Sequence, residues 1–445
     1  MDLAPGWEAR LDAYTDQLAV ALRASGWCGS NEAFCRYCGG LLLPGERKSM
    51  EPMAARLDPE HVQACHSSLQ RLITDSVWDH RALLKAVREF GLPRLTAKHP
   101  LEAWIGDDTS FPKKGTHSVG VAHQYCGNLG KQANCQVAVS ISLATGHGSL
   151  PAAYQLYLPE VWTQEPERCR AAGVPQDVVF RKKWEIALAL TDQLLLEGVP
   201  KAPFLWDAGY GPILAFRQGL TERGFVYAVG VRGDEPIWPP GWTPLAPGTR
   251  PPGAGRRRAD HLRQNPEMPL VTAKAWAMGL PPEAWQDVTW RQGTQGPLCS
   301  RFVAARVRPA QGCYNRKSDA IYRIPQEEWL LAEWPAGEPE PTRFWLSTFP
   351  ETTPINTLAY MAKLRWRIEE DYEELKQEFG LADFEGRTWQ GFHHHGSLCI
   401  ATRTFMMAER SRLFPPTPGT AFRLTRPAVP GARPWRRPAS KGRAS

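Results

Sequence analysis

The chain has 445 residues, 42% of them hydrophobic and 22% charged, which suits a globular protein of several structural units and excludes a disordered, collagen-like or coiled-coil chain. Its formal net charge is +7, but residues 414–445 hold seven basic residues and no acidic one, so the rest carries 46 residues of each sign. The remainder is therefore neutral, and net charge by itself does not indicate a nucleic-acid partner.

The N-terminal region, residues 1–95, has the three- and four-residue spacing of apolar side chains that predicts helices. Glycine and proline interrupt this pattern and predict a loop at residues 39–50. The helices are expected at residues 12–24, 59–73 and 79–90. A helical domain of this kind usually has a structural role, in which it packs against the rest of the fold. The alternative is a specific function, the binding of DNA ends.

The next region, residues 96–231, changes to short β-rich segments followed by alternating helices and strands. This order predicts a mixed sheet covered by helices. Strands are expected at residues 102–106, 118–123, 135–143, 202–206 and 225–231, and helices at residues 184–198 and 212–224.

Residues 232–345 contain eight of the chain's tryptophans and three expected strands, at residues 299–308, 327–334 and 342–348. They predict a β-rich insertion. Tryptophan at strand spacing belongs to the core more often than to a platform for nucleic-acid bases. The run Arg256–Arg258 is expected in a solvated loop, with a phosphate clamp as the alternative.

The last folded region, residues 346–413, contains a long expected helix at residues 355–380 and a second at residues 398–413. The histidines His393–His395 lie between them and are expected in a loop near the first helix. The tail, residues 414–445, is rich in proline and arginine without periodicity, which predicts disorder.

The ten cysteines have irregular spacings, and Cys35 and Cys38 lack a second pair at zinc-finger distance, so we expect no structural zinc. Apolar runs are much shorter than the roughly 18 residues that a membrane helix needs. The chain also begins without a secretion signal. We therefore expect a cytoplasmic protein with no membrane partner.

Three acidic residues stand where a site at a sheet edge would use them. Asp108 ends an early strand, Asp207 ends a buried strand before Gly209, and Glu369 lies on the long helix. Converging carboxylates need cations, and hard oxygen ligands favour Mg²⁺ or Mn²⁺. Two such ions can promote phosphodiester cleavage. Taken singly, each acid could instead cap a turn or lie on a charged helix face.

The long helix adds two basic residues to this set. Arg365, Glu369 and Lys376 are separated by four and seven residues, which places them on one helical face. A carboxylate that binds a metal, flanked by cations that bind phosphates, suits a nucleic-acid enzyme. An ordinary Arg–Glu pair is the alternative, and it leaves Lys376 unexplained.

With these motifs the sequence resembles the DDE-type transposases of cut-and-paste insertion sequences, which have a ribonuclease-H-like catalytic core. The resemblance runs from about residue 30 to about residue 410. Its parts are the first-aspartate strand and hairpins, the second-aspartate turn, the Arg-Glu-Lys part of a Tyr-Arg-Glu-Lys signature, and an N-terminal stretch, at residues 106–139, 204–217, 365–381 and 37–57.

The resemblance implies that Asp108, Asp207 and Glu369 are catalytic residues that bind the metal. Asp107 competes for the first place, and the family's usual Asp-Thr pairing favours Asp108. It also implies an α/β fold: a ribonuclease-H-like mixed sheet with flanking helices in residues 96–231 and 346–413, an N-terminal helical domain and the β-rich insertion.

The resemblance further implies that Arg365 and Lys376 contact the DNA backbone near the scissile phosphate, with Lys113 and Lys114 as further DNA-binding candidates. The signature tyrosine is replaced by Ala362, and Tyr360 is out of register with it.

The implied function is DNA transposition: binding of the terminal inverted repeats of an insertion sequence, followed by metal-dependent cleavage and strand transfer into target DNA. The implied cofactor is two Mg²⁺ or Mn²⁺ ions, and the implied assembly is a homodimer on double-stranded DNA, associated with the nucleoid. Ala362 and the unusual tail support the alternative, a catalytically inactive, transposase-derived DNA-binding protein.

Overall fold

The fold is that of a computed structural model, which describes residues 5–246, 265–293, 296–311 and 324–413. The predictions for Arg256–Arg258 and for the tail, residues 414–445, fall outside these described residues. Within them, no helix is both long and apolar enough to cross a membrane.

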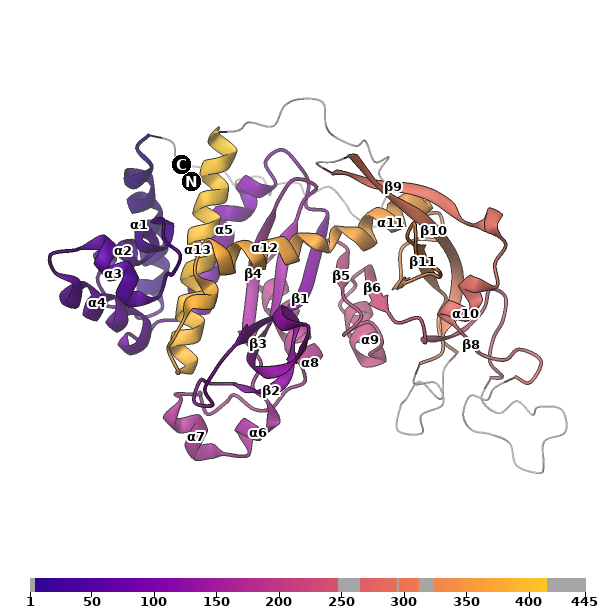
Figure 1. Cartoon of the computed structure of the whole chain (residues 1–445), viewed down its shortest axis with the longest axis horizontal. Helices are drawn as coiled ribbons and strands as arrows, with labels where there is room; N and C mark the ends of the chain where they lie inside the picture. Colours follow the sequence, from indigo (N-terminus) through magenta and orange to yellow (C-terminus); the bar gives the residue numbers. More distant parts are fainter. Residues whose placement is uncertain (1–4, 247–264, 294–295, 312–323, 414–445) are drawn as a thin grey trace, which may run out of the picture.

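The N-terminal helices form a cluster at one end of the molecule (Figure 1). They share an apolar core with the C-terminal helix α13, which α1, α2 and α5 contact. The expected helices correspond to α1, α4 and α5, whereas α2 begins before the predicted loop and extends into it. Their bounds are α1 Trp7–Ala24, α2 Asn31–Leu42, α3 Met50–Leu57, α4 Val62–Gln70 with a π-helical turn Arg71–Asp75, and α5 His80–Leu95.

A mixed sheet forms the centre of the fold. Strand β1 pairs antiparallel with β3 and parallel with β5, and β5 pairs parallel with β6, while β2 and β4 pair antiparallel with β3. This arrangement confirms the predicted ribonuclease-H-like sheet. The strands are β1 Ala103–Pro112, β2 Ala122–Cys126, β3 Lys131–Ala144, β4 Ser149–Leu156, β5 Phe204–Trp206 and β6 Tyr227–Val231.

Helices cover both faces of this sheet (Figure 1). On one face, α8 Lys183–Leu196 contacts β3, β4 and α9 Leu214–Glu222. On the other face, α12 Trp366–Gln377 contacts β1, β3 and β4. Two short helices, α6 Glu160–Thr163 and α7 Pro166–Ala171, connect β4 to α8.

The β-rich insertion is not a separate sheet, because β12 pairs antiparallel with β6 and β11 pairs with β12. Its strands therefore extend the central sheet. Trp238, Trp285 and Trp345 are buried, which agrees with their interpretation as core residues. The elements are β7 Pro236–Trp238, β8 Val271–Thr272, α10 Ala273–Met278, β9 Gln286–Gly293, β10 Gly296–Pro309, β11 Glu328–Trp334 and β12 Arg343–Ser347.

The long C-terminal helix is divided at Arg365 into α11 Ile355–Leu364 and α12. Helix α13 spans Trp389–Leu413, so the loop predicted around the three histidines is wrong. His393–His395 lie inside α13 and are at most 2% exposed. They are therefore core residues that do not reach phosphate.

Burial makes the histidines of α13 sensitive to acid. His393 accepts a hydrogen bond from the Leu156 N–H at Nε2 (3.2 Å), and its Nδ1 lies 2.9 Å from the Trp389 carbonyl oxygen, which suits a neutral ring. Burial lowers the pKa of His393 to about 3. In the unfolded chain this histidine is protonated near pH 6.5, whereas in the folded chain it stays neutral down to a much lower pH. The free energy of unfolding therefore falls as the pH drops below about 6.5.

We expect wild type to lose about 1.4 kcal/mol more unfolding free energy between pH 7.5 and pH 5.5 than His393→Gln loses. Comparing pH dependences cancels the contributions of all other titrating groups. Urea unfolding at both pH values measures the difference, and replacement of the exposed His123 by glutamine serves as the control. Equal pH dependence in wild type and His393→Gln would contradict the assignment of a buried neutral ring.

Candidate active site

The alternation of side chains along β1 separates the two neighbouring aspartates. Ile105 belongs to the apolar core beneath α12, whereas Trp104 belongs to the core beneath α8. By the same alternation, Asp107 faces α12 and Asp108 faces α8. Leu205 of β5 lies in the same core as Ile105, so Asp207, two residues further, follows on the α12 side of the sheet edge.

Arg365 joins the acidic residues at this edge. Its Nη1 donates to Asp107 Oδ2 over 2.6 Å, and its Nη2 donates to Glu369 Oε1. Burial lowers the pKa of Arg365, but the charges of Asp107, Glu369 and Asp207 outweigh it and raise the pKa overall. Asp107, Asp207 and Glu369 therefore all lie near one guanidinium group.

The ionised forms of Asp107 and Asp207, the two aspartates on the α12 side, are electrostatically unfavourable. Burial is the main cause that raises the pKa of Asp107 to about 7, and the neighbouring carboxylates of Asp207 and Asp108 add to it. Burial likewise raises the pKa of Asp207. Arg365 opposes the increase at both residues. A cation is thus the group that this cluster of carboxylates favours.

The turn after β5 fixes Asp207. Its Oδ1 accepts a hydrogen bond from the Gly209 N–H over 3.0 Å, as in an Asx turn. The turn also lies directly against β6, because a Cβ atom on Gly211 would come within 1.8 Å of the Gly230 carbonyl oxygen. Only glycine at position 211 permits this approach.

Asp108 makes its contacts on the α8 side of the sheet. Its Oδ1 accepts from the Tyr210 hydroxyl over 2.5 Å, and its Oδ2 accepts from Lys183 Nζ over 2.8 Å. In this structure Asp107, and not Asp108, is therefore the aspartate of β1 that contacts Arg365, while the charge of Asp108 still raises the pKa of Asp207. The physical reason is that consecutive strand residues face opposite sides of a sheet. The predicted role of Asp108 as a metal ligand stays a prediction.

The basic residue of the α12 stripe also faces β1. The Nζ of Lys376 lies 5.3 Å from the centroid of the Phe111 ring. Burial lowers the pKa of Lys376, while the charge of Asp107 opposes this effect. Lys376 therefore lies near Asp107. Together with Arg365 it forms a row of basic side chains along α12, called the basic track below.

Ala362, which stands at the position of the signature tyrosine, is a packing residue. Ala362 is buried within α11. The hydroxyl of Tyr360 donates to Glu102 Oε2 over 2.6 Å, which holds it beside the residue that precedes β1.

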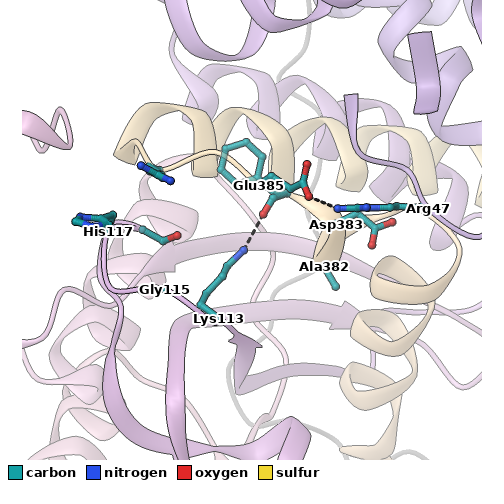
Figure 2. Close-up of a pocket in the computed structure, with 10 residues that line it drawn as sticks. Arg47, Lys113, Gly115, His117, Ala382, Asp383 and Glu385 are labelled. Atoms are coloured by element: carbon teal, nitrogen blue, oxygen red, sulfur yellow. Dashed lines mark hydrogen bonds and ion pairs between the residues drawn. The ribbon is translucent and has the colours of Figure 1, made fainter. Parts of the chain in front are cut away.

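The predicted DNA-binding lysines lie at the far end of β1. Lys113 lines a pocket of about 340 Å³ between the loop after β1 and the loop that joins α12 to α13 (Figure 2). Its Nζ donates to the Phe384 carbonyl oxygen over 2.7 Å, and Arg47 pairs with Glu385 across the same pocket. Lys114 is exposed beside it.

Two further residues lie near the acids and were not predicted from the sequence, Tyr210 and Lys183. Tyr210 had one signal, its place three residues after Asp207 in the Asp-Ala-Gly-Tyr turn. Lys183 had none, because it begins a helix 75 residues after Asp108 and meets it only in the folded chain.

The donor set has the chemistry of a site for a hard divalent cation. The candidate ligands are all carboxylate oxygens, from Asp107, Asp207 and Glu369. In this structure the guanidinium group of Arg365 supplies the positive charge between them. In the part of the chain that the structure describes, no three acidic, histidine or cysteine side chains form a complete metal-binding group. Arg365 occupies the space between Asp107 and Glu369 in this arrangement.

Comparison with known proteins gives two findings. The model of a family described as "DDE superfamily endonuclease" matches residues 31–297, which include β1 and β5 and end before α12. The "Probable transposase for insertion sequence element IS701" of Microchaete diplosiphon is 30% identical over 204 residues, which are 46% of this chain and 49% of that protein. The alignment thus covers about half the length of that relative.

Proposed function

This chain belongs to the family of DDE superfamily endonucleases, and from that premise we propose that it is the transposase of an insertion sequence. It binds the ends of its element, cuts the DNA there and joins the element to target DNA. The observation that carries this proposal is the gathering of Asp107, Asp207 and Glu369 around Arg365 at the edge of the sheet. The similarity to a probable transposase supports it further.

In this proposal Asp107, Asp207 and Glu369 hold Mg²⁺ or Mn²⁺, two ions in the full site. Bound divalent ions supply the activation of water and the stabilisation of the leaving oxygen in phosphodiester cleavage. Arg365 must then leave its carboxylate partners. Its guanidinium group is suited to bind a DNA phosphate near the cut.

The reaction consists of two displacements at phosphorus. In the first, a water oxygen attacks the phosphodiester at the element end, and the bond to the 3′ oxygen breaks. The element is left with a 3′-hydroxyl and the flanking DNA with a 5′-phosphate. In the second, this 3′-hydroxyl attacks a target phosphodiester and the target's own 3′ oxygen leaves. Arg365 and Lys376 orient the phosphates, and no covalent protein–DNA bond is formed.

A basic track along β1 and α12 indicates where the DNA runs. Lys113 lies six residues beyond Asp107, or about 20 Å along an extended strand. Since neighbouring phosphates of one DNA strand rise about 3.4 Å along the axis, this distance corresponds to about six base pairs. We propose that the loops around the 340 Å³ pocket contact the duplex at that distance from the cut.

The pocket contains basic side chains that acidic neighbours do not neutralise, so they are available to bind DNA. Arg47 neutralises Glu385, and Asp383 accepts a hydrogen bond from the Lys48 N–H over 2.7 Å. Arg387 lines the pocket and is exposed. Among the described residues, no ion pair or side-chain hydrogen bond is found for it, so its charge is free for a phosphate.

Replacement of Arg387 by glutamine is expected to weaken DNA binding and to reduce the slope of log affinity against log salt by about one. The loss should appear with duplexes that extend ten base pairs from the cut and vanish with duplexes that end after four. Fluorescence anisotropy at several salt concentrations measures both effects. Lys201→Gln, at the opposite end of β5, is the matched control. An unchanged salt slope with the long duplex would contradict the proposed DNA path.

Strand transfer distinguishes the transposase from its alternatives. We propose that two copies of the chain hold two element ends, because joining requires both ends at one target. Purified protein, an end duplex and a supercoiled target plasmid should give joined products in which the element 3′ end is linked to target DNA. Cleavage without joining would instead indicate a nuclease. Binding without either reaction would indicate the inactive DNA-binding protein that Ala362 suggests.

A further inference from the structure

The second aspartate of β1 forms a bridge on the α8 side of the sheet. Asp108 receives one hydrogen bond from the Tyr210 hydroxyl and one from the Lys183 ammonium group, so each carboxylate oxygen has its own donor. Asp108 is 28% exposed and Lys183 is 33% exposed, and a half-buried ion pair of this geometry is stronger than an ordinary surface pair.

This bridge connects the two segments that carry the candidate metal-binding aspartates. Asp108 follows Asp107 directly, and Tyr210 lies three residues after Asp207. The Asp108–Tyr210 hydrogen bond therefore ties β1 to the turn that carries Asp207. In the register between β1 and β5, Trp104 pairs with Phe204 and Ile105 with Leu205, so this pairing ends before the acids.

Tyr210 is itself packed among other aromatic side chains. Its ring lies 4.4 Å from the Trp206 ring and 5.3 Å from the Phe216 ring, between centroids, and it is 3% exposed. Its hydroxyl thus reaches Asp108 from the apolar core beneath α8. Lys183 begins α8 and brings a positive charge to the same carboxylate.

We propose that Asp108, Tyr210 and Lys183 are positioning residues that set the separation of Asp107 and Asp207 required for binding a divalent cation. This inference rests on the proposed function. Oxygen ligands of Mg²⁺ must lie about 2.1 Å from the ion, so small shifts of one strand end weaken binding. Groups that orient metal ligands from outside typically contribute 10- to 100-fold in affinity or activity.

The charge of Lys183 has a second effect in this arrangement. Asp107, Asp108 and Asp207 are three carboxylates at one sheet edge, and Lys183 neutralises the one that faces away from Arg365. Without Lys183, the unpaired charge of Asp108 would push the turn of Asp207 away from β1. The bridge therefore holds the edge together both by a hydrogen bond and by charge.

The test uses Tyr210→Phe in the full chain, because phenylalanine keeps the ring packing and removes only the hydroxyl. Mn²⁺ binding to the DNA-free protein, followed by electron paramagnetic resonance, should weaken about 10-fold relative to wild type. The Mg²⁺ concentration for half-maximal cleavage should rise by a similar factor, and the rate at saturating Mg²⁺ should stay within about threefold of wild type. Asp207→Asn, which removes a proposed ligand, is the control that abolishes both signals.

Lys183→Gln is the second variant, chosen because its partly exposed side chain leaves no core cavity. It should shift Mn²⁺ affinity in the same direction. Unchanged Mn²⁺ affinity in both variants would overturn the bridge. Loss of all Mn²⁺ binding in Asp108→Ala, equal to that of Asp107→Asn, would overturn it by making Asp108 a ligand. Normal Mn²⁺ binding by wild type without DNA cleavage would contradict the proposed function alone.

Discussion

Asp107→Asn is expected to slow cleavage of an element-end duplex by about 1,000-fold or more while leaving its affinity for that duplex within about threefold of wild type. Asparagine has nearly the same shape as aspartate and keeps an oxygen for the Asp108 N–H, while its amide group takes the place of the oxygen that accepts from Arg365. It removes the negative charge that a divalent cation needs. The loss therefore falls on catalysis, and folding and DNA binding are preserved.

The neighbouring residue provides the matched comparison. Asp108→Asn changes the same group one position along β1 but on the α8 side of the sheet, where it contacts Tyr210 and Lys183. We expect it to lower cleavage at limiting Mg²⁺ by about 10- to 100-fold and to recover at high Mg²⁺.

Single-turnover cleavage across a Mg²⁺ series, with binding measured in parallel, separates the two variants. If Asp108→Asn is inactive at every Mg²⁺ concentration and Asp107→Asn is active, the assignment made from the alternation of β1 is wrong. Equal loss of binding and cleavage in Asp107→Asn would make Asp107 a folding residue.

Arg403→Met is expected to reduce the free energy of unfolding by about 3–5 kcal/mol, because it leaves a buried carboxylate without its cation. Asp371 is fully buried, and its Oδ1 accepts hydrogen bonds from Arg403 Nη2 over 2.6 Å and from the Ser149 hydroxyl over 2.5 Å. Asp371 lies two residues after Glu369 on α12, so the pair also fixes α12 against α13. Urea unfolding followed by tryptophan fluorescence measures the loss.

The double variant Asp371→Leu/Arg403→Met tests the cause. Replacing both partners of a buried ion pair by apolar groups is often neutral, so this variant should recover most of the lost stability. If the double variant is as unstable as Arg403→Met, packing is the origin of the effect and the ion pair is not.

Much of the fold could be predicted from local sequence patterns. Helix α8 and strand β6 have clear apolar periodicities, and they form where these patterns predict. The helix α2 and the strand β4 were not predicted, since Pro151 and small residues obscure the pattern of β4. The insertion was expected as a unit of its own, and it joins the central sheet because β12 pairs with β6 across more than 100 residues, a contact that local periodicity does not encode.

Part of the geometry of the candidate site could be predicted from the sequence, and the choice of the first aspartate could not. The spacing of Arg365, Glu369 and Lys376 predicted a common helical face, and the Arg365–Glu369 ion pair and the position of Lys376 over Phe111 agree with it. The choice between Asp107 and Asp108 depends on which face of β1 is covered by α12. That is a property of tertiary packing, so the sequence pattern could not decide it. His393–His395 were misplaced for the same reason, since their polar character gave no sign of burial.

The most direct test of a metal-dependent DNA transposase is cleavage of a duplex that carries the element's terminal repeat, by the purified chain, with and without Mg²⁺. We expect a cut at the element end that requires Mg²⁺ or Mn²⁺ and leaves a 3′-hydroxyl on the element strand. Cleavage that persists with a chelator, or no cleavage of a tightly bound end duplex in either ion, would contradict it.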